Sequence, residues 1–278
     1  MTPKDIAVFL EDVDGCASRL QYAAALAAGW DAYLTAIFVA DELELNRMAG
    51  FAIGAGLANM LASHDAEVHA AEARMRQTFD ALVSARGLEA EWRIANHESR
   101  RHLVLLARHA SLAVIGPPAR PQVPSTRLSL LEDMIFSSGR PTLLIPNGWP
   151  SERAPRKVVL AWNGSAEAAR ALAYATPFLS AAEDVAVAIV PNAGIVADRN
   201  LDPGDIVLRH LAHHGVEAGL HRLDGHDAGN AILAFCETDE ADLLVMGAYG
   251  HSKFSEAIFG GATRHVLRHA KLPILLSR

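Results

Sequence analysis

The feature that most constrains this chain is an internal repeat, because segments of the second half resemble segments of the first half in the same order. The matching segments are 6–10 with 158–162, 34–39 with 185–190, 87–90 with 215–218, 111–116 with 242–247, and Pro141 with Pro273. The offset falls from 151 to 128 residues between the second and third pairs, which places 23 additional residues in the first half. The length of 278 residues also fits two domains of roughly 150 residues each. We therefore expect two related domains, over residues 1–147 and 156–278, with an insertion at about residues 41–62 of the first.

Each half alternates short apolar segments with segments of helical periodicity, a pattern that predicts βαβ units and a parallel sheet. In the second half we expect strands at 157–162, 184–190, 216–222, 242–246 and 273–277. The expected helices there are 165–179, 202–214, 228–238 and 262–271. Strands without polar alternation, such as residues 243–246, indicate that helices cover both faces of the sheet. The predicted fold class is α/β, with two tandem doubly wound domains that bind ligands beyond the carboxyl ends of their strands.

Composition excludes several classes of protein. The chain is 51% hydrophobic with a net charge of −7, so it lacks the broad basic surface of a nucleic-acid-binding protein. No apolar run approaches the ~20 residues that span a bilayer, and the N-terminal residues contain no apolar signal segment. Two cysteines, Cys16 and Cys236, cannot form a disulfide framework. We expect a cytoplasmic protein that engages neither nucleic acid nor a membrane.

The main chemical signal is a glycine-rich segment after the fourth strand of the second half. Gly247 and Gly250 are followed, after nine residues, by Gly260 and Gly261 at the start of a helix. Glycine lets the backbone approach a ligand closely, and the free amides of a helix N-terminus attract anions. We interpret the segment, with the amides from Gly261 to Thr263, as a phosphate-binding loop. The alternative is a surface loop that leads into a helix, since the segment matches neither a Walker A motif nor a dinucleotide fingerprint.

Three sequence motifs together resemble the universal stress protein family, specifically its tandem-domain members. They are Val-Val-Leu-Ala-Trp-Asn-Gly-Ser at 158–165, Gly-x2-Gly-x9-Gly at 247–260, and Arg-His-Val-Leu-Arg at 264–268 leading to Pro273. The resemblance implies a five-stranded parallel sheet of the adenine nucleotide alpha hydrolase-like type in each half. It also implies dimer-like pairing of domains, within the chain or between two copies. Some members bind ATP or a related adenine nucleotide, with magnesium. The implied nucleotide-binding positions are Asn163, Val190, Gly247, Gly250 and Gly260.

The second half departs from this pattern at two positions. Asn163 stands where nucleotide-binding members have Asp, so it keeps an oxygen and gains a donor but loses the charge. Gly261 stands where they have Ser or Thr, and Thr263 offers a hydroxyl two residues further on.

The first half departs much further from the same pattern. Gly116 is followed by Pro117 and Pro118, and Leu128 and Ser129 occupy the positions of Gly260 and Gly261. Asp12 or Asp14 takes the acidic position after the first strand. Proline removes amide donors and leucine obstructs a close approach. We therefore expect the first half to serve as a structural partner that does not bind nucleotide in the usual way.

The functional hypothesis is a stress-response protein that binds an ATP-like nucleotide in its C-terminal domain as a regulatory ligand. One alternative is a scaffold or interaction protein of the same fold that binds no nucleotide. A second is a carrier of an apolar ligand, with the Met- and Gly-containing insertion at 43–61 as a flap. The competing interpretation of that insertion is a helical hairpin over the domain's own core, continued by 63–86, where Val68, Ala71, Met75, Phe79 and Leu82 share a face.

We expect neither an enzyme nor a metal site. The sequence lacks the Gly-x-Ser-x-Gly motif of serine hydrolases and a carboxylate pair with assignable acid and base roles, although slow ATP hydrolysis stays open. The 13 histidines include His265 and His269 on one helix face, but no pattern of Cys, Asp or Glu completes a tetrahedral ligand set.

Overall fold

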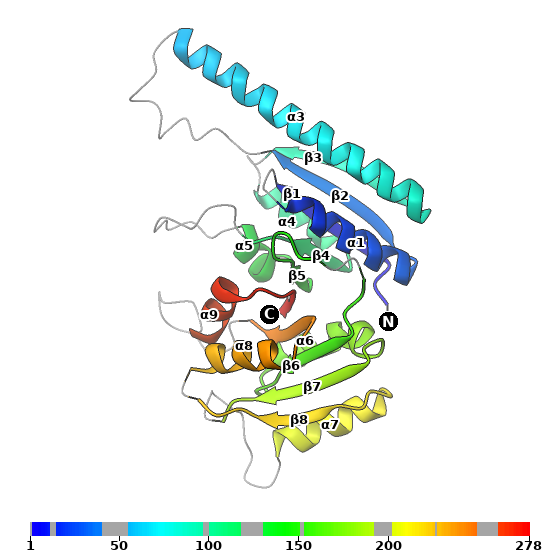
Figure 1. Cartoon of the computed structure of the whole chain (residues 1–278), viewed down its shortest axis with the longest axis vertical. Helices are drawn as coiled ribbons and strands as arrows, with labels where there is room; N and C mark the ends of the chain where they lie inside the picture. Colours follow the sequence, from blue (N-terminus) through cyan, green and yellow to red (C-terminus); the bar gives the residue numbers. More distant parts are fainter. Residues whose placement is uncertain are drawn as a thin grey trace.

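Ten strands form one continuous sheet in the computed structural model (Figure 1). The structure describes residues 2–11, 15–40, 55–96, 100–117, 130–150, 153–191, 202–225, 227–248 and 261–278. The first half contains β1 (Asp5–Glu11), α1 (Cys16–Trp30), β2 (Tyr33–Ala40), α3 (Ala55–Arg86), β3 (Ala90–Asn96), α4 (Arg100–Arg108), β4 (Leu112–Ile115), α5 (Leu130–Ser137) and β5 (Thr142–Leu144). The second half contains β6 (Lys157–Ala161), α6 (Ala166–Leu179), β7 (Asp184–Ile189), α7 (Pro203–His213), β8 (Gly219–Arg222), α8 (Ala228–Thr238), β9 (Leu243–Gly247), α9 (Gly261–His269) and β10 (Ile274–Ser277).

Each half contributes five parallel strands with the same topology, β3-β2-β1-β4-β5 in the first half and β8-β7-β6-β9-β10 in the second. This confirms the predicted fold class. The predicted elements of the second half agree with the observed ones to within a residue or two, except that the third strand begins at Gly219 instead of Val216. The amide of Val216 donates to the carbonyl oxygen of Leu211 at 3.0 Å, after Gly215 at φ +73°. Val216 therefore ends helix α7 before the strand begins.

Helices cover both faces of the sheet and create two cores (Figure 1). Helices α1, α3, α6 and α7 pack against one face, and α4, α5, α8 and α9 against the other. Successive strand residues alternate between the cores, so that Val245 lies in the first and Leu244 in the second. This explains why an interior strand such as β9 is apolar at successive positions from Leu243 to Met246. Both cores include residues from both halves of the chain.

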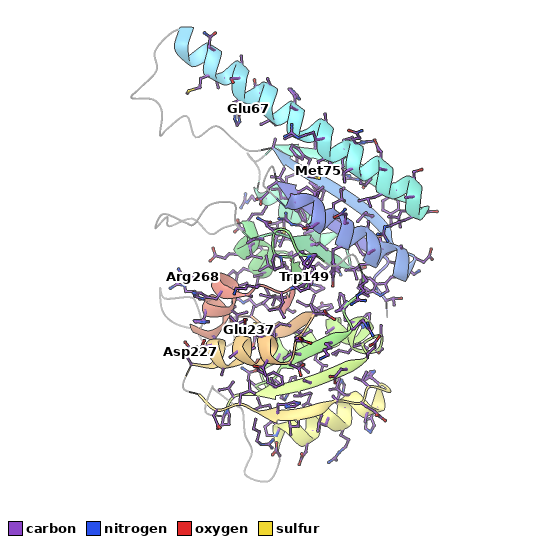
Figure 2. The ribbon with its side chains drawn as sticks, viewed as in Figure 1. Glu67, Met75, Trp149, Asp227, Glu237 and Arg268 are labelled. Atoms are coloured by element: carbon purple, nitrogen blue, oxygen red, sulfur yellow. The ribbon has the colours of Figure 1, made fainter. Side chains whose placement is uncertain are left out.

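The two halves join where β5 pairs with β10 in the only antiparallel contact among the described strand pairs. Leu143 pairs with Leu275. These two residues are equivalent in the repeat, because the offset of 132 residues that relates Pro141 to Pro273 also relates Leu143 to Leu275. The pairing is therefore symmetric with respect to the repeat. Trp149, just beyond β5, packs against both cores at the junction between the halves (Figure 2).

Helix α3 is the longest described element, with 32 residues over Ala55–Arg86. Its residues Val68, Ala71, Met75, Phe79 and Leu82 all contact the core beside α1 and β2, which confirms the face predicted for 63–86. Trp92 of β3 donates its indole N–H to Glu72 at 2.8 Å and fixes the helix against the edge of the sheet. Residues 41–54, which hold most of the predicted insertion, lie outside the described residues. No described helix combines the length and the apolar character that crossing a membrane requires.

Replacing Phe178 by alanine tests the contact between the halves on the α1 and α6 side. Phe178 is buried, and its ring lies edge-on to Trp30 of α1 with the ring centroids 4.8 Å apart. We expect Phe178→Ala to lower the free energy of unfolding by about 3–5 kcal/mol, measured by chemical denaturation. Tyr174→Ala is the matched control, since Tyr174 lies on the same helix with 39% of its surface exposed. Equal losses in the two variants would contradict this assignment.

Candidate ligand site at the carboxyl ends of strands β6, β7 and β9

Three positions predicted for the ligand site follow neighbouring strands. The sheet order places β6 between β9 and β7, and Ala161 of β6 pairs with Met246 of β9 and Ala188 of β7. Asn163 and Val190 each lie two residues beyond these paired positions, after β6 and β7. Gly247 lies one residue beyond Met246 and ends β9. Adjacent strands lie about 4.8 Å apart, so these positions share one edge of the sheet. Open α/β sheets bind ligands at such an edge.

The turn after β6 holds Asn163 in a defined orientation. Its Oδ1 accepts a hydrogen bond from the backbone N–H of Ser165 at 3.1 Å, across Gly164 at φ +72°. Ser165 then caps helix α6, because its Oγ accepts from the N–H of Ala168 at 3.2 Å. With Oδ1 engaged in the turn, the Nδ2 amide of Asn163 makes no hydrogen bond within the described ranges. Position 163 therefore presents a donor where a carboxylate would present an acceptor.

Gly247 has a packing role that the sequence did not reveal. A Cβ atom on Gly247 would lie 2.5 Å from the amide nitrogen of Ala168 and 2.7 Å from the carbonyl carbon of Glu167. The first turn of α6 thus packs directly on the end of β9, and only glycine fits there. Contact of Gly247 with a ligand stays a prediction.

Helix α9 begins at Gly261. A Cβ atom at this position would meet no atom of the described residues within 4 Å. Thr263, two residues further on, is buried, as is Val266 of the same helix. In the first turn of an α-helix the backbone N–H groups have no partner within the helix, and they carry partial positive charge. The start of α9 at Gly261 is therefore the part of this helix where an anion would be attracted, and contact of Gly261 or Thr263 with a ligand stays a prediction.

Asp227 is a residue of this region that the sequence analysis missed. Its Oδ1 caps helix α8 by accepting from the N–H groups of Gly229 and Asn230 at 3.0 and 3.2 Å. Its Oδ2 lies 3.7 Å from Nδ1 of His265, so α8 and α9 meet through this pair (Figure 2). The signal was available, since an Asp directly before the helical segment 228–238 is a typical N-cap. Helix α9 itself carries two arginines and two histidines and no acidic residue.

The remaining predicted positions divide into two groups. Val190 is buried at the end of β7 in the core that includes α8 and α9. Gly250 and Gly260, with Asp12, Asp14, Leu128 and Ser129 of the first half, lie outside the described residues. Within the described ranges, no group of three His, Cys, Asp or Glu side chains is arranged to hold a metal ion.

Comparison with known proteins gives a family match for the second half of the chain. Residues 155–278 match the Universal stress protein family. The predicted resemblance to this family is thereby confirmed. A universal stress protein of Synechocystis sp. is 31% identical over 153 residues, which cover 53% of this chain and 50% of the relative. The chain thus spans about half the length of the curated relative that it matches.

Two solved structures share the fold over nearly the whole chain. A universal stress protein from Archaeoglobus fulgidus superposes with a TM-score of 0.73 at 18% identity, covering 98% of this chain and 96% of its own. A protein of unknown function from Pseudomonas aeruginosa gives a TM-score of 0.60 at 14% identity, covering 99% of this chain and 92% of its own. Both superpositions extend over the first half, which the family match does not include.

Alanine substitutions at Gly247 and Gly261 test whether a side chain fits at each position. Gly247→Ala places a methyl group against the backbone of α6, and we expect a loss of about 1–3 kcal/mol in the free energy of unfolding. Gly261→Ala meets open space, and we expect it to be neutral or to stabilise the protein by up to about 1 kcal/mol. Thermal and urea unfolding measure both. Full stability of Gly247→Ala would contradict the packing assignment.

Proposed function

We propose that this protein is a stress-response protein whose C-terminal half, residues 156–278, binds ATP or a related adenine nucleotide as a regulatory ligand. The observation that carries the proposal is the convergence of Asn163, Val190 and Gly247 at the carboxyl ends of three adjacent strands, beside a glycine segment that leads into α9. The family match supports it, because the universal stress protein resemblance implies nucleotide binding at these positions.

In this proposal the phosphates contact backbone amides instead of cationic side chains. The segment from Gly247 through Gly250 to Gly260 would surround the phosphate chain, with the N–H groups of Gly261 to Thr263 as donors. Asn163 and the backbone at Val190 would contact the nucleoside. The chain has a net charge of −7, so local amides and the positive end of the α9 dipole must supply the attraction for an anion.

The nucleotide acts in this proposal as a signal and not as a substrate. Bound nucleotide shifts a conformational equilibrium only through its different affinity for the two states, and that difference would control partner choice. The first half, residues 1–147, would be the structural partner. The symmetric register of β5 and β10 supports pairing of the halves as an intramolecular pseudo-dimer. Cys16 and Cys236 are buried and form no disulfide, which is compatible with action in the cytoplasm.

A second candidate is a scaffold of the same fold that binds no nucleotide. Two features favour it: the Oδ1 atom of Asn163 is engaged by Ser165, and Gly261 brings no hydroxyl to the helix N-terminus. An apolar-ligand carrier would depend on the insertion at 43–61, of which residues 43–54 lie outside the described part of the chain and residues 55–61 belong to α3.

Thermal unfolding with and without magnesium ATP distinguishes the two candidates. Ligand that binds only the native state, at 100 times its dissociation constant, adds about 2.7 kcal/mol to the free energy of unfolding. We expect a concentration-dependent rise in Tm with the wild-type protein and with Gly29→Val, an open and exposed control position in α1. Gly250→Val should abolish the rise. Absence of a shift at millimolar ATP, with no nucleotide released from the purified protein by mass spectrometry, would favour the scaffold.

Restoring a hydroxyl at position 261 should strengthen nucleotide binding. A serine side chain has room there, and one additional hydrogen bond contributes about 0.5–1.5 kcal/mol. We expect Gly261→Ser to bind magnesium ATP roughly 2- to 10-fold more tightly in titration calorimetry. Gly261→Ala, which fills the same space without a donor or acceptor, is the control. An unchanged affinity in the serine variant would place the phosphates away from the start of α9.

A further inference from the structure

The carboxyl ends of β1 and β4 in the first half are occupied by a buried arginine. Arg19 of helix α1 is 0% exposed, the largest side chain that is fully buried in the described residues. Its Nη1 donates to the carbonyl oxygen of Phe9 in β1 at 2.8 Å, and its Nη2 donates to Oδ1 of Asn147 at 3.0 Å. A Cβ atom on Gly116, directly after β4, would lie 1.5 Å from Nη2. The guanidinium therefore lies against the backbone at the ends of two adjacent strands.

The second half fills the equivalent space differently. There the first turn of α6 packs on Gly247, the repeat counterpart of Gly116. Helix α1 begins at Cys16, the counterpart of Ala168, whereas α6 already begins at Ala166. When the two halves are aligned by the repeat, α1 thus starts two residues later than α6. The Arg19 side chain occupies the space against the strand end that helix backbone occupies in the second half.

Arg19 leaves no room for a ligand beside it. A side chain with no exposed surface touches no space large enough for a water molecule. Its Nε–H is buried without an acceptor, and no carboxylate of the described residues pairs with it. The two acceptors among the described residues are neutral oxygens, and these two hydrogen bonds orient the buried guanidinium.

The linker between the halves provides that constraint. Asn147, which accepts from Nη2, lies between β5 and β6. The next residue, Gly148, donates its N–H to the carbonyl oxygen of Gly15 at 3.4 Å, and a Cβ atom on Gly15 would lie 2.4 Å from that nitrogen. Gly15 also has φ +81°, so glycine alone meets both requirements. The start of α1 and the linker are therefore in direct contact.

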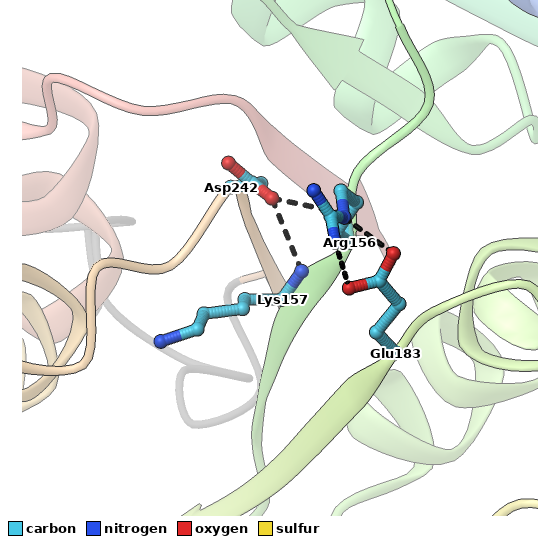
Figure 3. Close-up of polar contacts among 4 residues, drawn as sticks. All are labelled: Arg156, Lys157, Glu183 and Asp242. Carbon is cyan, nitrogen blue, oxygen red and sulfur yellow. Dashed lines mark hydrogen bonds and ion pairs between the residues drawn. The ribbon is translucent and has the colours of Figure 1, made fainter.

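The other end of the linker is fixed at the amino ends of β6 and β9 (Figure 3). Oδ2 of Asp242 accepts from the backbone N–H groups of Arg156 and Lys157 at 2.9 and 3.1 Å. The guanidinium of Arg156 pairs with Glu183, just before β7, and holds the pKa of that carboxyl below its usual value. The linker is thus held at both ends. Arg19 bonds to its start at Asn147, and Asp242 bonds to its end at Arg156 and Lys157.

We propose that the first half contains a guanidinium-binding recess, formed by Phe9, Gly116 and Asn147, that the protein fills with its own Arg19. This contact closes the carboxyl edge of the first half to ligands and anchors the linker that sets how the halves meet. It does not depend on nucleotide binding in the second half. The recess recognises a planar group that donates hydrogen bonds to two neutral oxygens, the chemistry of a guanidinium and not of an ammonium ion.

Chemical rescue of Arg19→Ala tests this proposal, with methylguanidinium as the probe and ethylammonium as its control. Trypsin cleavage after Arg153 in the linker reports release of the anchor. We expect Arg19→Ala to lower Tm and to speed this cleavage roughly tenfold, since proteolysis follows the population of the open form. Low-millimolar methylguanidinium should restore most of the protection, and ethylammonium should not. Arg93→Ala, which removes an exposed arginine of β3, should show neither effect.

A variant that removes only one hydrogen bond of Arg19 tests the same proposal if Arg19→Ala fails to fold. Asn147→Ala removes one acceptor and leaves the bond from Arg19 to Phe9, and we expect a several-fold faster cleavage after Arg153 without loss of the folded state. Unchanged linker cleavage in the folded variants would overturn the proposal. So would equal rescue of Arg19→Ala by ethylammonium, because the recess would then recognise charge alone.

Discussion

The antiparallel pairing of β5 with β10 is the contact on which the rest of the structure depends. Without it, each half would end in a three- or four-residue strand with unpaired backbone groups, a ready site for association. With it, ten strands share one sheet, and the cores on both faces continue from one half into the other. The Trp30–Phe178 contact and the burial of Trp149 both follow from this junction.

The symmetry of the junction does not extend to the carboxyl ends of the strands. In the second half, α6 begins early enough to pack on Gly247, and Asn163 lies in the turn that leads into α6. In the first half, Arg19 takes the equivalent space and bonds to the linker. The same scaffold thus places helix backbone at the strand ends of one half and an arginine side chain at those of the other. The two halves of a repeat can keep their junction while the strand ends diverge.

Much of the fold could be predicted from the sequence, because its signals are local. Continuous apolar runs such as 243–246 indicated strands covered on both faces, and the Asn163-Gly164-Ser165 turn marked the start of α6. The glycine pattern at 247–260 indicated where a ligand site would lie. The strand at 216–222 was placed too early, since Val216 is apolar and buried but its amide serves to end α7. The apolar side chain of Val216 indicates that the residue is buried, but it does not indicate which carbonyl oxygen its backbone amide bonds to.

The sequence by itself determined the two-fold repeat, the α/β class and the positions that follow each strand, since these depend on periodicity and short-range turn chemistry. Only the tertiary structure decided what those positions face. Gly247 was expected to approach a ligand, and the structure shows that it packs on α6. Arg19 carried no sequence signal, although it is the largest fully buried side chain in the described residues. Both results depend on contacts between residues separated by about 80 to 130 positions in the chain, such as Arg19 with Asn147. Such contacts exist only once the sheet has brought the strand ends together.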